Sequence, residues 1–252
     1  MSTFAFENQV AFVTGTNKKN GIGQAVVTAL LEQGVQKVYA TAREVSQLKD
    51  LVTEHEGKVV AVELDVTDLE AIKKLPTLYP DVTLVINNAG YFSANNTLTT
   101  DFSLAQQEMQ VNYIAPLAIV SSFAPVLTKQ SVQTGVVNIA SIASLVNFPA
   151  GGTYSASKAA THSLTQAQRR DLPGSLVIGV YPGPIDTEMA ENLPFDKTPP
   201  SVVANSVVEA LKKGQEDVFP DAMASSLYDG WKVDAKMIER TMAQSVVQEV
   251  AQ

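Results

Sequence analysis

The chain has no cysteine and only two histidines, and these absences exclude several kinds of site. Without thiols there can be no disulfide and no thiolate-bound metal. His55 and His162 lie far apart in the sequence, and no spacing of carboxylates suggests a cation site. We therefore expect no metal.

Positive charge and long apolar segments are also scarce. The formal net charge is −8, the wrong sign for a nucleic-acid binder, and the pair Lys18-Lys19 is too short to form a basic patch. The N-terminal segment lacks the positive flank and long apolar core of a secretory signal. No apolar run approaches the roughly 18 residues of a membrane helix. These features predict a cytoplasmic protein without nucleic-acid or membrane partners.

Along the chain, short apolar runs alternate with segments of helical periodicity. Hydrophobic residues make up 45% of the chain and charged residues 17%, enough for a sizeable core. Short apolar runs, expected as strands, occupy 9–15, 37–42, 58–66, 82–90, 135–141 and 175–183, and helical patterns occupy 22–34, 45–54, 68–75, 101–127 and 153–172. Continuous apolar strands are typical of a sheet covered on both faces. The expected fold class is α/β, a Rossmann-type doubly wound parallel sheet in three α/β/α layers.

Prolines and glycines set the expected ends of these elements. Pro76 is expected to end the third helix, and Pro116 and Pro125 to kink or end the fourth. The proline-rich segment 184–200 is expected to be a substrate lid loop. Beyond it we expect a helix at 201–214, a short strand at "DVFP" and a helical region at 224–248. No linker or repeat divides residues 1–252, which predicts a single domain.

The stretch "TGTNKKNGIG", residues 14–23, lies between the first strand and the first helix. Glycines there let the backbone approach a pyrophosphate, and the helix N-terminus offers free N–H groups. This predicts a dinucleotide loop. Its candidate contacts are Gly15, Asn17, Gly21, Ile22 and Gly23, with Lys18 or Lys19 free to reach a phosphate or to remain solvated.

The end of the second strand indicates which dinucleotide is bound. An NAD-preferring fold places an acidic residue there, whereas this chain has Ala42-Arg43. A guanidinium suits the 2′-phosphate of NADP(H), so NADP(H) is expected over NAD(H), although Arg43 could be an ordinary solvated side chain. Asp65 could bind the adenine edge or cap the turn before Thr67.

The stretch Tyr154-Ser-Ala-Ser-Lys158 is the strongest chemical signal. On a helix, residues i and i+4 share a face, so the phenol and the ammonium can share a site. A nearby cation is expected to lower the pKa of Tyr154 toward the working pH, which makes the phenol a general acid or base. Ser141 ends the fifth strand at the ligand-binding edge of the sheet, where its hydroxyl could hold a substrate oxygen.

These motifs occur in a fixed order. Thr14-Gly15…Gly21-Ile22-Gly23, Asn87-Asn88-Ala89-Gly90, Asn112, Ser141, Tyr154-x-x-x-Lys158 and Pro182-Gly183-x-x-x-Thr187 resemble the short-chain dehydrogenase/reductase family in its compact branch, from about residue 8 to 190. The glycine loop alone departs from the family pattern, by two extra residues. Such linked motifs are far more specific than any one of them.

The resemblance implies a catalytic tetrad of Asn112, Ser141, Tyr154 and Lys158. Tyr154 would transfer the proton, Ser141 would polarise the substrate oxygen, Lys158 would bind the nicotinamide ribose, and Asn112 would hold a relay water. Ser144 is the weaker candidate for the serine. The resemblance also implies cofactor contacts from Val66, Asn88, Ala89, Gly90, Pro182, Gly183, Ile185 and Thr187.

The sequence thus predicts an NADPH-dependent carbonyl reductase or alcohol dehydrogenase acting on a ketone, aldehyde or secondary alcohol. The alternatives are a non-redox enzyme of the same fold, such as an epimerase, and a non-catalytic NADP(H) sensor. Apolar residues of the edge loops could wall a substrate pocket or merely cover the sheet: Phe92, Val146, Phe148, Met189, Leu193 and Phe195.

A homodimer through the helices at 101–127 and 153–172, or a homotetramer, is expected. The charged C-terminus lacks the glycine-rich tail that many members of the family have.

Overall fold

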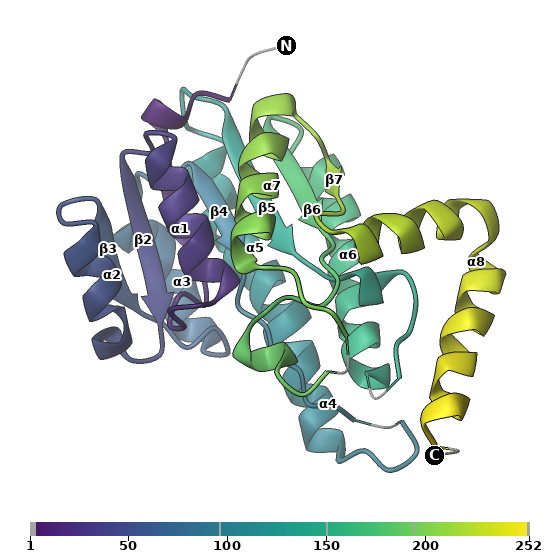
Figure 1. Cartoon of the computed structure of the whole chain (residues 1–252). Helices are drawn as coiled ribbons and strands as arrows, with labels where there is room; N and C mark the ends of the chain where they lie inside the picture. Colours follow the sequence, from purple (N-terminus) through teal and green to yellow (C-terminus); the bar gives the residue numbers. More distant parts are fainter. Residues whose placement is uncertain (1–3, 96, 150, 194, 251–252) are drawn as a thin grey trace.

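The computed structural model describes residues 4–95, 97–149, 151–193 and 195–250, the side chains of 244–250 excepted. The first three and last two residues of the expected domain, and position 194 of the expected lid, lie outside this range. Figure 1 shows a central sheet with helices on both sides and a C-terminal helix that extends beyond the sheet.

The described strands form one parallel sheet in the order β3-β2-β1-β4-β5-β6-β7. Their bounds are β1 Val10–Val13, β2 Lys37–Ala42, β3 Val59–Glu63, β4 Leu84–Asn87, β5 Thr134–Ile139, β6 Ser175–Val180 and β7 Asp217–Val218. The order reverses between β1 and β4, and a doubly wound sheet binds ligands at such a point. The predicted fold class is confirmed.

Alternate residues of each strand feed a separate core on each face of the sheet. In β1, Ala11 and Val13 pack with α1 (Ile22–Glu32), α2 (Lys49–Glu54) and α7 (Pro200–Lys213). On the other face, Val10 and Phe12 pack with α3 (Leu69–Leu78), α5 (Ala115–Leu127) and Leu172, which directly follows α6 (Gly152–Asp171). Burial on both faces explains why the strands are apolar without alternation.

Two helix predictions need correction. Pro76 does not end its helix, because α3 continues to Leu78 with the proline in its last turn; there a missing N–H costs only one intrahelical bond. The helical run Phe102–Leu127 is long and apolar enough, by length and composition, to cross a membrane, and an 18-residue window within it has a mean hydropathy of 1.4. The expectation from the sequence that no apolar run is long enough for a membrane helix overlooked this segment. Ile119, Phe123 and Leu127 place it in the core of the domain.

The same run is not one regular helix. It consists of α4 (Phe102–Met109), a π-helical turn at Gln110–Ile114, and α5, which has Pro116 in its first turn and Pro125 inside it. Pro116 and Pro125 therefore do not end the run. A π turn displaces one backbone bond and is frequent at functional sites.

The C-terminal region is helical, as predicted, but broken. Helix α8 (Ala222–Val250) contains an extended residue, Asp234, with φ −152° and ψ 90°. Its carboxylate accepts from the Met237 N–H at 2.9 Å and so caps the second half of the helix. The first half is anchored by stacked rings of Phe219, Tyr228 and Trp231.

Candidate active site

A cleft of about 940 Å³ lies where the loops after β1 to β6 meet at the carboxyl edge of the sheet. Of the predicted site residues, it brings together Gly15, Asn17, Lys18, Lys19, Gly21, Ile22, Gly23, Arg43, Asp65, Val66, Asn88, Ala89, Gly90, Ser141, Tyr154, Lys158, Pro182, Gly183, Ile185 and Thr187. Asn112 alone does not line the cleft and is buried behind it.

The glycine loop is fixed to the end of β4 by hydrogen bonds. The Asn88 side-chain amide donates to the carbonyls of Thr14 and Gly15, both at 2.9 Å, and the Thr14 hydroxyl accepts from the Asn88 and Ala89 N–H groups at 3.0 Å. Gly15 has φ +69°, and a Cβ there would lie 2.7 Å from the Ala89 Cα. Only glycine fits this approach. Helix α1 then begins without a side-chain cap, which leaves its N–H groups open to an anion.

The two extra residues of the loop form an exposed turn. The Gly21 N–H donates to the Lys18 carbonyl at 3.0 Å, and Lys18, Lys19 and Asn20 are exposed. The Lys18 ammonium lies 2.6 Å from the Glu188 carboxylate in the loop after β6. The extension therefore connects the glycine loop with the expected lid.

Arg43 and Asp65 line the cleft directly after β2 and shortly after β3. Asp65 performs its capping role: one carboxylate oxygen accepts from the Thr67 N–H at 2.8 Å and from the Thr67 hydroxyl at 2.7 Å. The backbone hydrogen bond from Thr67, with the Arg43 charge adding to it, holds the pKa of Asp65 below its ordinary value. Asp65 thus remains ionised and orients the turn beside Arg43.

Ser141 and Ser144 differ clearly in position. Ser141 lines the cleft, and its hydroxyl oxygen accepts from the Ala143 N–H at 3.1 Å. Ser144 is buried, does not line the cleft, and its hydroxyl has no partner among the described residues. The geometry favours Ser141 as the serine that contacts a ligand.

Tyr154 and Lys158 share the cleft, but their pKa values differ from the prediction. The Lys158 Nζ atom lies 5.7 Å from the centre of the Tyr154 ring and donates to the Ile139 carbonyl at 2.9 Å. Burial raises the pKa of Tyr154 to about 12, opposed by the Ser141 hydroxyl and reinforced by the charge of Glu108. Burial also lowers the pKa of Lys158 to about 8. The expected lowering of the tyrosine pKa is wrong, because burial dominates the shift and the Lys158 charge is not among its causes.

Asn112 anchors the loop that follows β4. Its side-chain oxygen accepts from the Tyr91 N–H at 2.8 Å, and its amide donates to the Tyr91 carbonyl at 2.9 Å and to the Ser157 hydroxyl at 2.8 Å. Its backbone carbonyl, in the π-helical turn, accepts from the Thr161 hydroxyl at 2.7 Å. Asn112 therefore joins the β4 loop to α6, one turn from Lys158.

The sequence reasoning missed several residues that shape the site. Gln107 and Val111 line the cleft, and their i, i+4 spacing on the helix that carries Asn112 was a readable signal. Asp221 accepts from the Gly183 N–H at 2.7 Å and so fixes the turn after β6. Nothing in the sequence connects Asp221 with that turn, because they are 38 residues apart.

One side of the cleft is apolar. Phe92, Phe148, Met189, Leu193 and Phe195 line it, whereas Val146 is buried away from it. The segment after β6 is pinned at its ends by a bridge between Ile185 and Thr198, with the Asp186 N–H donating to the Thr198 carbonyl at 2.9 Å. A loop closed at its base in this way can present its apolar residues as one unit.

His162 is bound into a polar cluster beside the cleft. Its Nδ1 atom lies 2.8 Å from the Tyr181 hydroxyl, which donates to Asp217 at 3.1 Å. Arg169 also contacts Asp217, at 2.8 Å. The cluster ties α6 to β6 and β7, and His162 does not line the cleft.

Comparison with known proteins agrees with this geometry. A family profile described as short chain dehydrogenase matches residues 9–198. A short chain dehydrogenase of Burkholderia cenocepacia, solved in complex with NADP, is 36% identical, covers 94% of this chain and 98% of its own, and superposes with a TM-score of 0.86. A second enzyme, from Burkholderia phymatum and solved with NAD, shares the fold with 21% identity, 91% and 96% coverage and a TM-score of 0.78.

Relatives found by sequence are also described as oxidoreductases. An uncharacterised oxidoreductase of Staphylococcus aureus is 31% identical over an alignment of 216 residues, which covers 81% of this chain and 91% of the relative. The family profile, over residues 9–198, includes the glycine loop, the tyrosine and lysine pair and most of the loop after β6. The chain belongs to the short chain dehydrogenase family of oxidoreductases.

Proposed function

We propose that the protein is an NADPH-dependent carbonyl reductase, which in reverse oxidises a secondary alcohol. One observation carries this proposal. The Tyr154 phenol, the Ser141 hydroxyl and the Lys158 ammonium line one cleft together with the glycine loop. An acid, an oxygen ligand and a cation thus stand beside a dinucleotide site, which is the arrangement that carbonyl reduction requires.

The cleft fits a nicotinamide dinucleotide. The close approaches at Gly15 and Gly23, where a Cβ would meet the Ala89 backbone and the Gly15 carbonyl, and the uncapped start of α1 form a cradle for a pyrophosphate. Asn88 and Gly90 would hold the adenosine ribose, and Ile185 and Thr187 the carboxamide. When bound, the cofactor supplies the hydride.

The protein residues would handle the substrate oxygen. Ser141 would donate to the carbonyl oxygen and hold it beside the Tyr154 phenol. With its pKa raised to about 12, Tyr154 stays protonated at neutral pH and can donate its proton as the oxygen becomes an alkoxide. Lys158, while charged, stabilises the phenolate left behind. We assign Asn112 the role of holding the loop after β4 in place beside Tyr154 and Lys158. We assign the loop at 184–200 the role of the substrate lid.

The apolar wall supports an uncharged, hydrophobic carbonyl compound as the substrate. Phe92, Phe148 and Phe195 offer aromatic surface. The lysines and arginine among the described lining residues of the cleft are those assigned to the cofactor and the proton transfer: Lys18, Lys19, Arg43 and Lys158. Purified protein should therefore oxidise NADPH with aryl ketones and aldehydes faster than with keto acids. Turnover with none of a broad panel of ketones, aldehydes and keto-esters, despite NADPH binding, would contradict the reductase proposal.

Arg43 carries the proposed preference for NADP(H) over NAD(H). Arg43→Ala removes a charge-assisted contact worth about 1.5–3 kcal/mol, so the KM for NADPH should rise about ten- to a hundredfold, while the KM for NADH stays unchanged. Steady-state kinetics with both cofactors measures this. Arg170→Ala, at an exposed arginine paired with Asp171, is the control. A wild-type enzyme that does not prefer NADPH would disprove the assignment.

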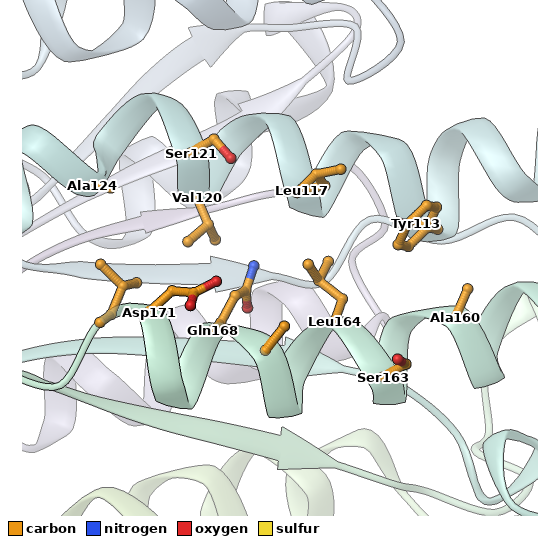
Figure 2. Close-up of a pocket in the computed structure, with 12 residues that line it drawn as sticks. Tyr113, Leu117, Val120, Ser121, Ala124, Ala160, Ser163, Leu164, Gln168 and Asp171 are labelled. Carbon is orange, nitrogen blue, oxygen red and sulfur yellow. The ribbon is translucent and has the colours of Figure 1, made fainter.

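We also propose that the protein is cytoplasmic and forms a homodimer. An apolar groove of about 440 Å³ between α5 and α6 supports the dimer (Figure 2). Only 39% of the most apolar window of Phe102–Leu127 is buried within one chain, and a second copy of the same face would cover it. Small residues such as Ala160 and Ala167 line the groove and permit close helix contact. Ala167→Arg should halve the mass in light scattering; an unchanged dimeric mass would place the interface elsewhere.

A further inference from the structure

Glu108 is a fully buried acid to which the proposed mechanism gives no role. It lies on α4, one helical turn before Asn112, and its exposed fraction is 0%. One carboxylate oxygen, Oε2, is buried without a hydrogen-bond partner among the described residues. Burying a carboxylate oxygen without a hydrogen-bond partner costs free energy, so its presence here indicates a specific role.

The other oxygen of Glu108 fixes the loop after β4. Oε1 accepts from the Ser93 N–H at 2.9 Å and from the Ser93 hydroxyl at 2.5 Å. Asn112, four residues further along the same face, holds Tyr91 through both its N–H and its carbonyl. The Glu108 and Asn112 side chains, one turn apart, therefore hydrogen-bond to the backbone on either side of Phe92.

Phe92 is the residue that these hydrogen bonds place in the active site. Its ring packs edge-on against the Tyr154 ring, with centroids 5.0 Å apart and planes at 72°, a favourable aromatic geometry. Phe92 also lines the cleft beside the apolar wall. The orientation of the proton donor and the shape of the substrate wall thus depend on one short loop.

We propose that Glu108 is a positioning residue of the reductase site, which acts through Ser93 to hold Phe92 against the ring of Tyr154. The inference rests on the proposed function, because it assigns Tyr154 as the proton donor. The charge of Glu108 also contributes to the raised pKa of Tyr154, and therefore favours the protonated phenol that reduction needs.

Two substitutions separate these contributions. Glu108→Ala releases Ser93, so the KM for the carbonyl substrate should rise about ten- to a hundredfold as the wall moves, with NADPH affinity unchanged. Glu108→Gln keeps an oxygen acceptor for Ser93 and removes the charge. The pH profile of alcohol oxidation, which rises as Tyr154 loses its proton, should then shift to lower pH. Glu7→Gln, an exposed change before β1, is the control.

Hydrogen exchange tests the positioning without any turnover. The Ser93 amide should exchange faster in Glu108→Ala than in the wild type, which distinguishes failure of this inference from failure of the reductase assignment. Protection of that amide unchanged in the alanine variant would overturn the proposal. If the alanine variant does not fold, Ser93→Ala and Glu108→Gln decide it: a wild-type KM in the first and a wild-type oxidation profile in the second overturn it.

Discussion

Tyr154→Phe is expected to lower kcat for carbonyl reduction by about a thousandfold, within the usual range for loss of a general acid. The substitution removes one oxygen and leaves the ring, so the edge-on contact with Phe92 remains. The Ser141 hydroxyl and the Lys158 ammonium stay in the cleft. Single-turnover reduction, followed by loss of NADPH fluorescence, measures the chemical step directly.

Cofactor binding provides the check on this result. The pyrophosphate cradle lies in the glycine loop, so the Kd for NADPH should be unchanged in Tyr154→Phe. Tyr228→Phe, in the aromatic stack of α8, removes a phenol hydroxyl from a residue that is not among the described residues lining the cleft, and should keep full activity. Near-normal turnover by Tyr154→Phe would refute the proton-transfer role of this residue.

The fold and the members of the cleft could be predicted because their signals are local. Each strand carries its own apolar run, and each ligand-edge motif follows its strand directly, so parallel topology alone brings Gly15, Asn88 and Ser141 to one edge. The end of α3 was wrong because a proline in a last turn costs little, which the residue type does not reveal.

Relations across the chain could not be predicted in this way. The pKa of Tyr154 depends on how deeply the loops bury it and on Glu108 and Ser141, which the spacing of Tyr154 and Lys158 in the sequence does not reveal. The contact between Lys18 and Glu188 joins two segments 170 positions apart that no periodicity connects. Glu108 could have been noticed as an acid one turn before Asn112, but its bond to Ser93 requires the loop conformation.

Lys158→Met is expected to abolish turnover and yet to stabilise the protein at pH 7. Burial lowers the pKa of Lys158 from 10.5 to about 8, so the unfolded chain holds this proton more tightly than the folded one. At 1.36 kcal/mol per pKa unit, the charged lysine costs the folded state on the order of 3 kcal/mol. Methionine keeps the unbranched apolar stem. It loses the hydrogen bond to the Ile139 carbonyl, worth about 1 kcal/mol, so a net gain of about 2 kcal/mol remains.

The pH dependence identifies the cause of that gain. The penalty is complete below pH 8, shrinks as the pH rises from about 8 to 10.5, and is absent above that. Urea unfolding at pH 7 and at pH 10 should therefore show the variant more stable at the lower pH and no more stable than the wild type at the higher one. Lys129→Met, at an exposed lysine, should show no such difference. A variant that is less stable at pH 7 would mean that Lys158 supports the fold, whereas the expected result would show that the site sacrifices stability to keep a cation beside Tyr154.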